Sequence, residues 1–259
     1  MRAIARGGLL VALVASTVVP FGLLLVASVS RSWFFPAVWP AAVTSDAWAL
    51  VPGALGGAAL VSAGIAVATG VLSCAIGFPI GRAIAALTGW RRHVGAALAF
   101  LPIAAPAIAV GTGAQYYFLR VGLGGTWVGV MLAHLIPAAG LASLYFLSVF
   151  VVADLRIEDE ARTLGARPWQ VLVHVTIPAF RRQVAEAVAL GFLVSWSQVP
   201  LTLLVGGGLV RTLPIQVFSY LNAGQERYAA VGALMLVVPP MVVLGSVLLG
   251  TSRAEVVAA

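Results

Sequence analysis

The chain has 259 residues, of which 61% are hydrophobic and only 9% are charged, and its mean hydropathy is +1.06. An ordinary soluble domain carries roughly 25% charged residues, so this composition excludes a water-soluble globular protein. The formal charge of +7 comes from 15 arginines and no lysine, and most of these arginines lie in short gaps between apolar blocks. That distribution indicates orientation in a membrane. It argues against a nucleic-acid ligand, which needs clustered cations.

Six apolar blocks follow one another along the chain, most of them near the ~20 residues that a helix needs to cross a bilayer. They are continuous and not alternating, which excludes a membrane β-barrel. Because backbone groups must be satisfied within lipid, the blocks must be helices. The sequence therefore predicts an all-α, polytopic protein of about six transmembrane helices. The expected spans are residues 7–29, 53–87, 94–119, 126–152, 184–205 and a last block that ends near residue 250.

The first two apolar blocks have features that bear on how they cross the membrane. The first is longer than the roughly 7 to 15 apolar residues of a secretory signal, so a retained helix is expected. In the second, Gly77 and Pro79 are expected to bend or break the helix near its inner end. The segment 30–52 between them includes Trp33, Phe34 and Phe35, an aromatic mixture typical of the membrane interface.

The arginines predict the orientation of the spans. Eleven of them fall on one side of this arrangement and four on the other, and the richer side is expected in the cytoplasm. Both termini then lie in the cytoplasm. Segments 30–52 and 206–228, the second expected as a polar loop, face outward. The one long charged stretch, residues 154–182, connects the fourth and fifth spans and faces inward.

This charged stretch reads as two short helices. Gly165 stands where a C-terminal cap would end the first helix, and Pro168 suits the first turn of the second. Each helix has an apolar face at helical spacing. The faces consist of Ile157, Ala161 and Leu164 in the first helix, and of Trp169, Leu172, Val173 and Thr176 in the second.

The stretch resembles the cytoplasmic coupling loop of ABC importer permeases, whose pattern is Glu-Ala-Ala, three residues, Gly, nine residues, Ile, one residue, Leu-Pro. With Gly165 as anchor, Asp159 falls on the family's Glu, so the carboxylate is retained but shortened, and Glu160 adds a second one. Weaker, colinear similarity covers about residues 60–249 and leans toward the polyamine, ferric-iron, thiamine and oxyanion permeases. The resemblance implies that ATPase coupling rests on Asp159, Glu160, Ala161, Leu164, Gly165, Trp169, Val175, Ile177 and Pro178.

The resemblance also implies an architecture and a set of partners. Residues 1–259 would form a single transmembrane permease domain of the type I importer fold, with a core at about 53–250 and a coupling loop at about 154–182. The expected location is the bacterial inner membrane. The expected partners are two ATP-binding cassette ATPases, an identical or homologous second permease, an external solute-binding protein and a small-molecule substrate. The chain lacks a Gly-x-x-x-x-Gly-Lys-Ser/Thr loop, so ATP and Mg would be bound by the partner ATPase and not by this chain.

Polar residues inside the fifth span point to a substrate path. Ser195, Gln198 and Thr202 fall at i, i+3 and i+7 and form one polar stripe. Such groups mark a substrate route or bond helices to each other, and both readings stay open. Glu186 lies one turn after Arg182, which favours an interfacial ion pair, and His134 is expected to be a packed, hydrogen-bonded histidine.

Three other functions compete with this one. An intramembrane enzyme needs paired acids or a nucleophile with a base, and no block offers them, so no catalytic residue is expected. A secondary transporter usually shows ionisable residues at the bilayer midplane. A permease of the sugar class is the third alternative. The lone Cys74 and the widely separated histidines, His93, His134 and His174, predict no metal site.

Overall fold

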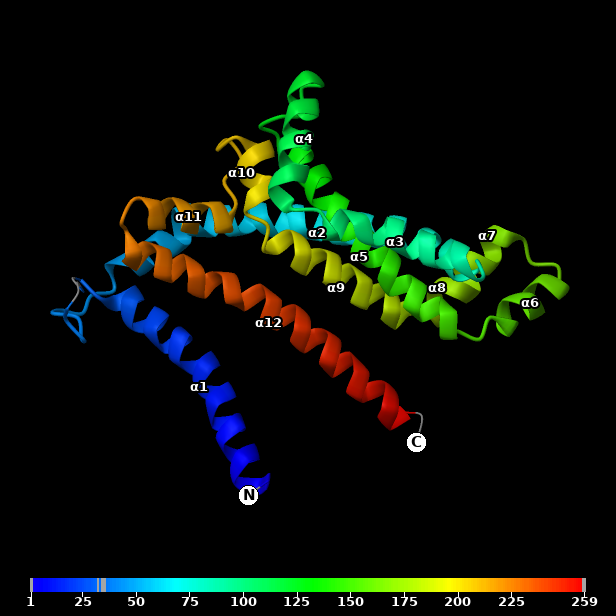
Figure 1. Cartoon of the computed structure of the whole chain (residues 1–259), viewed down its shortest axis with the longest axis horizontal. Coiled ribbons are helices and arrows are strands. Elements are labelled where there is room, and N and C mark those ends of the chain that lie inside the picture. Colours follow the sequence, from blue (N-terminus) through cyan, green and yellow to red (C-terminus); the bar gives the residue numbers. More distant parts are fainter. Residues whose placement is uncertain (1, 32, 34–35, 258–259) are drawn as a thin grey trace. The chain divides into compact units, whose positions relative to one another are not determined.

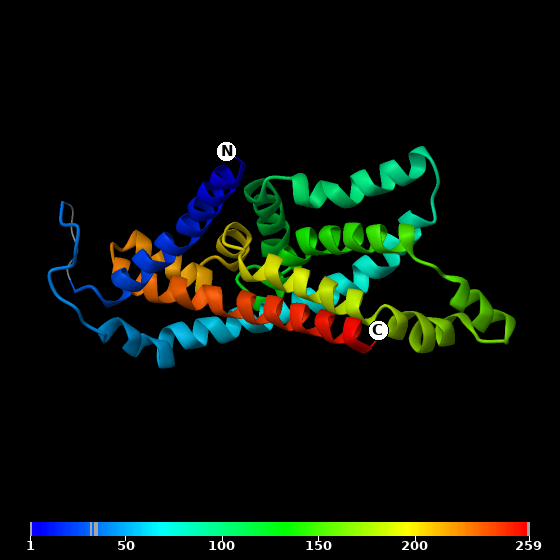
Figure 2. The ribbon, with the colours of Figure 1, turned by 90° about the horizontal axis from the view of Figure 1, so that it is seen from below.

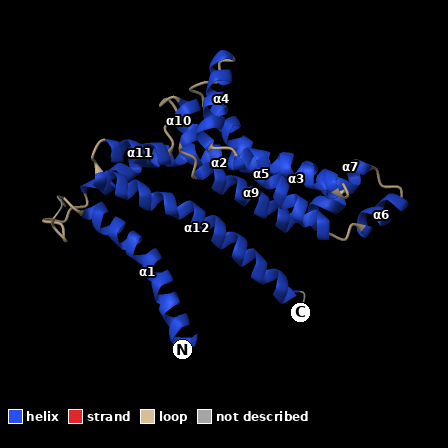
Figure 3. Cartoon of the chain, in the orientation of Figure 1, coloured by secondary structure: helices blue, strands red, loops and turns tan. Residues whose placement is uncertain are grey.

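The computed structural model describes residues 2–31, 33 and 36–257, and these form helices and connecting loops (Figures 1 and 3). Within that range the only β structure is an isolated bridge between Ser30 and Val43, which confirms the all-α prediction. Phe34 and Phe35 lie outside the described residues. The elements are α1 (Arg2–Val29), η1 (Asp46–Leu50), η2 (Val51–Leu55), α2 (Gly56–Ala85), α3 (Trp90–Ala104), α4 (Ala107–Arg120), α5 (Trp127–Val152), α6 (Arg156–Thr163), α7 (Pro168–Val171), η3 (Leu172–Thr176), α8 (Ile177–Ala179), α9 (Arg181–Trp196), α10 (Pro200–Gly206), α11 (Leu213–Asn222) and α12 (Glu226–Val257).

The helices account for the predicted number of membrane spans. Among the described residues, four helical segments are long and apolar enough to cross a membrane on their own. Two further helix pairs pass the same test together, α3 with α4 and α9 with α10, which raises the number to six. With each bent pair counted as one span, the prediction of about six spans is confirmed.

The third predicted span is not one straight helix. α3 ends at Ala104, and α4 begins at Ala107 with its axis turned by 84°. Ala105 and Pro106 between them have extended backbones, with ψ angles of 134° and 127°. Pro106 has no amide hydrogen, so the carbonyl of Pro102 loses its helical donor and the helix ends there.

The fifth predicted span is also broken. α9 ends at Trp196, and α10 begins at Pro200 with an axis turned by 66°. Pro200, at the first position of α10, marks the start of the new direction. The polar stripe, however, is distributed over two helices and the break between them, so the single-helix spacing used to predict it does not hold.

By contrast, α2 runs without a break from Gly56 to Ala85, through both Gly77 and Pro79. Of the bend or break predicted there, the break is therefore wrong. The irregular backbone lies at the other end of this span, where Gly53 has φ −107° and ψ −107°. A proline inside a membrane helix is tolerated where neighbouring groups satisfy the freed carbonyl.

Glycines allow α2 to approach its neighbours closely. A Cβ at Gly77 would lie 2.5 Å from the Cβ of Ala142, and one at Gly81 would lie 2.6 Å from the Cβ of Phe146. Neither position can therefore hold a larger side chain without moving α5. This is the close packing expected from the many small residues.

The contacts divide the chain into two compact units, and each is described by itself. The first comprises residues 2–61 and 211–242. Segment 206–228, predicted as a polar loop, contains the helix α11, whose Leu213, Ile215 and Val217 are buried. The loop prediction is therefore wrong for residues 213–222, because Pro214 and the apolar residues around it start a helix instead.

The second unit comprises residues 62–210 and 243–257. In it α5 lies beside α3 and α9 (Figures 1 and 2). One apolar cluster centres on Phe78, Phe146 and Phe150, whose rings meet edge to face at 4.9 and 5.2 Å from Phe78. Another centres on Val130 and Leu201 and holds α10 against α5. Together they fix the base of the charged loop and the two broken helices.

Candidate functional site

The charged loop begins with the predicted first helix, α6. Its end is closed by Gly165, which has φ +88°. The amide of Gly165 donates to the carbonyl of Arg162 at 3.0 Å, and the amide of Ala166 donates to that of Ala161 at 3.0 Å. These two bonds form a Schellman cap, which needs a residue that adopts a left-handed backbone without strain. The predicted turn at Gly165 is confirmed.

The second helix begins at Pro168 as predicted, and the side chain of Gln170 accepts the amide of Arg167 at 2.8 Å. It continues as a wider helical turn, η3, before α8. This wider turn shifts the register, so the buried residues are Val171 and Thr176. Trp169 is 67% exposed, and the predicted shared face of Trp169 and Thr176 is wrong for that reason.

Most of the predicted coupling residues lie on the surface of the loop. Leu164 is 88% exposed and Ile157 is 54% exposed. Asp159 forms an exposed ion pair with Arg162 at 3.0 Å. Glu160, Ile177 and Pro178 are exposed, whereas Ala161 and Val175 are half-buried. The loop therefore presents apolar side chains to its surroundings that no described part of the chain covers.

One carboxylate of the loop, that of Glu158, is buried. Its side chain is 2% exposed. Arg82, near the end of α2, donates to both carboxylate oxygens at 2.9 and 2.5 Å. The hydroxyl of Thr176 donates to Oε1 at 2.8 Å, and Arg162 donates to Oε2 at 3.3 Å. The Glu158 cluster, meaning these four side chains, thus ties both loop helices to α2.

The environment of Glu158 keeps it ionised. Burial raises the pKa of its carboxyl, but the hydrogen bonds from Arg82 and Thr176 and the charges of Arg82 and Arg162 outweigh burial. The net pKa lies below the ordinary value. The stabilisation is therefore present above the ordinary carboxyl pKa and is lost only as the pH falls through the lowered one.

Sequence reasoning missed Glu158. It concentrated on the apolar face of α6 and on Asp159, which the family pattern selects. Glu158 immediately precedes that position in the sequence, and its main partner, Arg82, is 76 residues away. Thr176 and Arg82 are polar residues at the base of the loop and could have suggested a polar contact there. No spacing in the sequence, however, indicates that either of them meets Glu158.

The predicted polar stripe divides into two parts. Ser195 and Thr202 are buried, and each bonds to His134 of α5, at 2.8 Å to Nδ1 and 2.9 Å to Nε2 respectively. His134 is 1% exposed, so the prediction of a packed, hydrogen-bonded histidine is confirmed. These contacts match the helix-packing reading for Ser195 and Thr202.

Gln198 lies elsewhere, in the break between α9 and α10. It lines a pocket of about 260 Å³ together with Ser197. The opposite wall of this break pocket comes from the other broken span, through Pro102, Ala105 and Ala107. Two helix interruptions thus meet at one cavity. Irregular backbone at membrane depth is tolerated where it is buried in protein or lines a water-filled cavity.

The ionisable side chain inside the fifth span, Glu186, is paired. Arg182 donates to Glu186 at 2.9 Å, as predicted, and the Tyr145 hydroxyl also donates to Glu186. Within the described part of the chain, no three His, Cys, Asp or Glu side chains come together as metal ligands would. The candidate site therefore consists of the charged loop and a small uncharged cavity.

A family comparison decides what this arrangement belongs to. Residues 77–251 match the family described as "Binding-protein-dependent transport system inner membrane component". The chain belongs to this family. It is the permease subunit of an ABC importer, and it is not itself an enzyme. The match begins within α2 and includes the charged loop, residues 154–182, and both broken spans.

Curated relatives agree with this assignment. The permease is 30% identical over 203 residues to the molybdenum transport system permease protein ModB of Mycobacterium tuberculosis, covering 73% of this chain and 77% of the relative. It is also 30% identical over 215 residues to the trehalose transport system permease protein SugB of the same species, covering 78% and 77%.

Solved structures show the same fold. A bacterial ABC transporter that imports the acidic polysaccharide alginate has a chain that superposes with a TM-score of 0.66, at 18% identity, over 95% of this chain and 94% of that one. The alginate transporter in complex with its alginate-bound periplasmic protein gives 0.65 at 13% identity, over 99% and 97%. The permease thus has the type I importer fold. It is a multi-pass inner-membrane protein, and its partners are of the ATPase and solute-binding-protein kinds.

Proposed function

We propose that residues 154–182 of this permease dock on a separate ATPase and transmit its movement to the spans. The Glu158 cluster carries this proposal. A buried carboxylate with three donors links α6 and η3 to α2, which supports a fixed loop over a solvated connector. Its outer surface, with Leu164 and Trp169 exposed, offers apolar area to a partner.

The proposed contacts combine those apolar residues with charge. Asp159 and Glu160 are exposed beside them and supply acceptors for cationic or backbone donors on the ATPase. ATP and Mg would be bound by that partner. In this scheme the loop faces the cytoplasm, as the arginine distribution favours, and both termini lie on the same side as the loop.

We also propose that the break pocket forms part of the substrate path. Gln198 is its main polar side chain, and backbone groups freed by the two breaks lie around it. Discontinuous membrane helices supply backbone donors and acceptors to substrates in other transporters. Ser195 and Thr202 would then act by holding α9 and α10 on His134, without touching the substrate.

For the substrate we favour a small oxyanion. The residues that line the break pocket include neither an acidic nor a basic side chain. Polyamines, ferric iron and thiamine would lack carboxylate partners there, which disfavours them. Neutral amide and hydroxyl donors suit an oxyanion, and ModB is a molybdenum permease by name.

A sugar is the second candidate, because SugB matches slightly more of the chain than ModB does. Uptake of radiolabelled molybdate and trehalose into proteoliposomes that contain the permease, its ATPase and its solute-binding protein would separate the two classes. Uptake of trehalose but not of molybdate would overturn the oxyanion proposal and leave the coupling proposal intact.

The coupling proposal is tested by Gly165→Val. A β-branched residue resists the left-handed backbone at this position, so the Schellman cap and the angle between the two loop helices should be lost. We expect the protein to insert normally but to retain less ATPase in a pull-down and to lose ligand-stimulated hydrolysis.

Gly122→Val is the matched control. Gly122 has φ +74°, and like Gly165 it has open space where a Cβ would be, but it lies between α4 and α5. The backbone strain should therefore be similar in the two variants, but only Gly165→Val introduces it into the charged loop. ATPase retention at the wild-type level in Gly165→Val, or equal losses in both variants, would contradict the assignment.

A further inference from the structure

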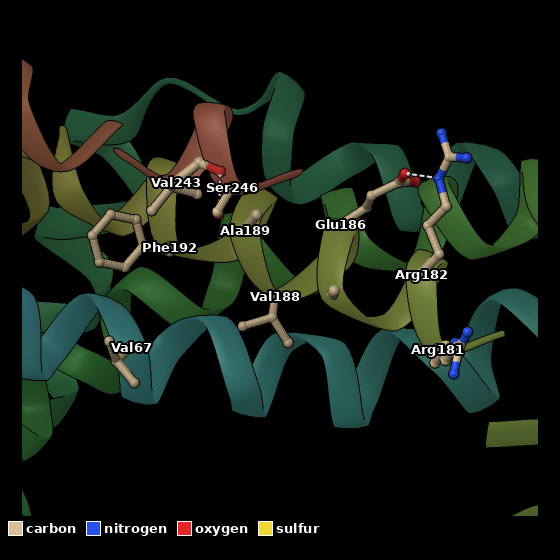
Figure 4. Close-up of a pocket in the computed structure, with 10 residues that line it drawn as sticks. Val67, Arg181, Arg182, Glu186, Val188, Ala189, Phe192, Val243 and Ser246 are labelled. Carbon is tan, nitrogen blue, oxygen red and sulfur yellow. Dashed lines mark hydrogen bonds and ion pairs between the residues drawn. The ribbon is translucent and has the colours of Figure 1, made fainter. Parts of the chain in front are cut away.

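A second, larger pocket lies outside the machinery described so far. It has a volume of about 600 Å³ and is lined by residues of α2, α9 and α12 that all belong to the second unit (Figure 4). Its walls are apolar, formed by Val67, Val188, Phe192 and Val243 among others. Arg181, Arg182 and Glu186 gather at one end (Figure 4).

The two ends of this α9 pocket differ in charge. At the charged end Arg182 is neutralised by Glu186 at 2.9 Å. Arg181 is exposed, and within the described residues it has no ion pair with a carboxylate. One positive charge is thus left at the mouth of an otherwise apolar pocket. The ligand that matches this pattern has one anionic end and a long apolar remainder.

The length of the pocket fits one leaflet of a bilayer. Arg181 opens α9, and Phe192 lies 11 residues further along the same helix. At ~1.5 Å per residue these two positions are separated by ~16 Å along the axis. Half of a hydrocarbon core of ~30 Å is ~15 Å. An acyl chain with its head at Arg181 would therefore reach Phe192 near the bilayer midplane.

We propose that the α9 pocket binds an anionic phospholipid, with the phosphate at Arg181 and Arg182 and an acyl chain between α2, α9 and α12. Basic pockets between membrane helices on one face of a bilayer are suited to such head groups. The site requires only that the chain spans the membrane. It does not depend on the docking or substrate proposals.

The lipid would have a structural consequence. The pocket is bounded by α2, which carries Arg82, and by the start of α9, which directly follows the docking loop. A bound lipid would fill the space between these two helices near the membrane surface. Anionic lipid content would then set how firmly the base of the loop is supported.

The test uses the complete complex with its ATPase, exchanged into vesicles of phosphatidylglycerol or of phosphatidylethanolamine with the same acyl chains. Lipid retained on the permease is measured by native mass spectrometry. We expect preferential retention of phosphatidylglycerol, reduced about fivefold for each arginine removed in Arg181→Gln and in Arg181→Gln with Arg182→Gln. Arg91→Gln is the control, since Arg91 is also exposed at the start of a helix, α3, but does not line the pocket.

Two further measurements identify the occupant. A photoreactive residue at Ala189, in the pocket wall, should crosslink to lipid. Crosslinking to a second permease chain would overturn the proposal, as would equal retention of the two lipids in wild type and variants. Displacement of phosphatidylglycerol by inorganic phosphate alone would show an anion site without a lipid, and would also overturn it. If the double variant fails to assemble, Arg181→Gln leaves the Arg182–Glu186 pair intact and decides the question.

Discussion

At the scale of single residues, Glu158 is a buried carboxylate of the charged loop that accepts hydrogen bonds from three side chains. Its burial would be unfavourable without its donors, because a buried charge must be paired and hydrogen-bonded. Arg82 also lies over the ring of Phe150, 5.7 Å from its centroid. The guanidinium is therefore positioned from two sides, by the loop and by α5.

We expect Glu158→Gln to loosen the loop. A hydrogen bond to a charged partner contributes about 1.5 to 3 kcal/mol, and Arg82 would be left half-buried without its carboxylate. Hydrogen exchange of the complete complex should become faster at the amides of residues 171–180, while the spans keep their protection. Glu226→Gln removes an exposed carboxylate at the start of α12, outside the loop, and should leave exchange at these amides unchanged. Equal protection in both variants would show that the Glu158 cluster does not hold the loop.

Gln198 allows a separate prediction. Gln198→Leu should reduce transport or change its selectivity without loss of assembly, because the amide lines the break pocket and the His134 contacts remain. Substrate uptake and the amount of purified complex are measured together. Ser195→Ala is the comparison, since it should lower thermal stability by about 1 kcal/mol through the lost bond to His134. Wild-type uptake in Gln198→Leu would leave only a packing role for this residue.

At the scale of helices, the close approach of α2 to α5 depends on two glycines. We expect Gly81→Val to destabilise the permease, because a Cβ there would lie 2.6 Å from atoms of α5 and overpacking typically costs about 1 to 3 kcal/mol. Gly64→Val on the same helix is the control, since no atom lies within 4 Å of its Cβ position. The midpoint of thermal unfolding in detergent distinguishes them, and equal midpoints would contradict the packing described.

The helices also show how far the sequence could predict this structure. Apolar block length gave the number of spans, because lipid leaves few alternatives to a helix. It could not say which prolines interrupt a span. Pro79 and Pro137 lie inside continuous helices, whereas Pro106 and Pro200 stand at breaks. The difference depends on which neighbouring groups satisfy the freed carbonyls, and those neighbours are distant in sequence.

Prediction of the charged loop from the sequence was limited in a similar way. Gly165 and Pro168 were predictable because caps and first turns follow local rules. The wider turn at Leu172–Thr176 was not, so the buried face of the second helix was assigned one register away. The Arg82–Glu158 contact is long-range, and periodicity within one helix carries no information about it.

At the scale of the whole permease, orientation in the membrane is the main prediction. A cysteine introduced at Asp46 should react with a membrane-impermeant maleimide in intact cells, because segment 30–52 is expected outside. One introduced at Glu160 should react only after permeabilisation. The native Cys74 is buried and should stay silent in both. The reverse pattern of labelling would invert the topology and move the docking loop away from any cytoplasmic ATPase.

The uninterrupted course of α2 has a mechanical consequence. Because α2 is one helix from the glycines that touch α5 to Arg82, a displacement of Arg82 would reach those contacts through continuous helical backbone. The spans that meet at the break pocket are jointed, and each joint has few residues to rotate. A movement of the loop would thus be transmitted through α2 and would rotate the helices at the two breaks, α3–α4 and α9–α10. The points of rotation would then surround the break pocket, whereas the continuous helix would lie next to the loop.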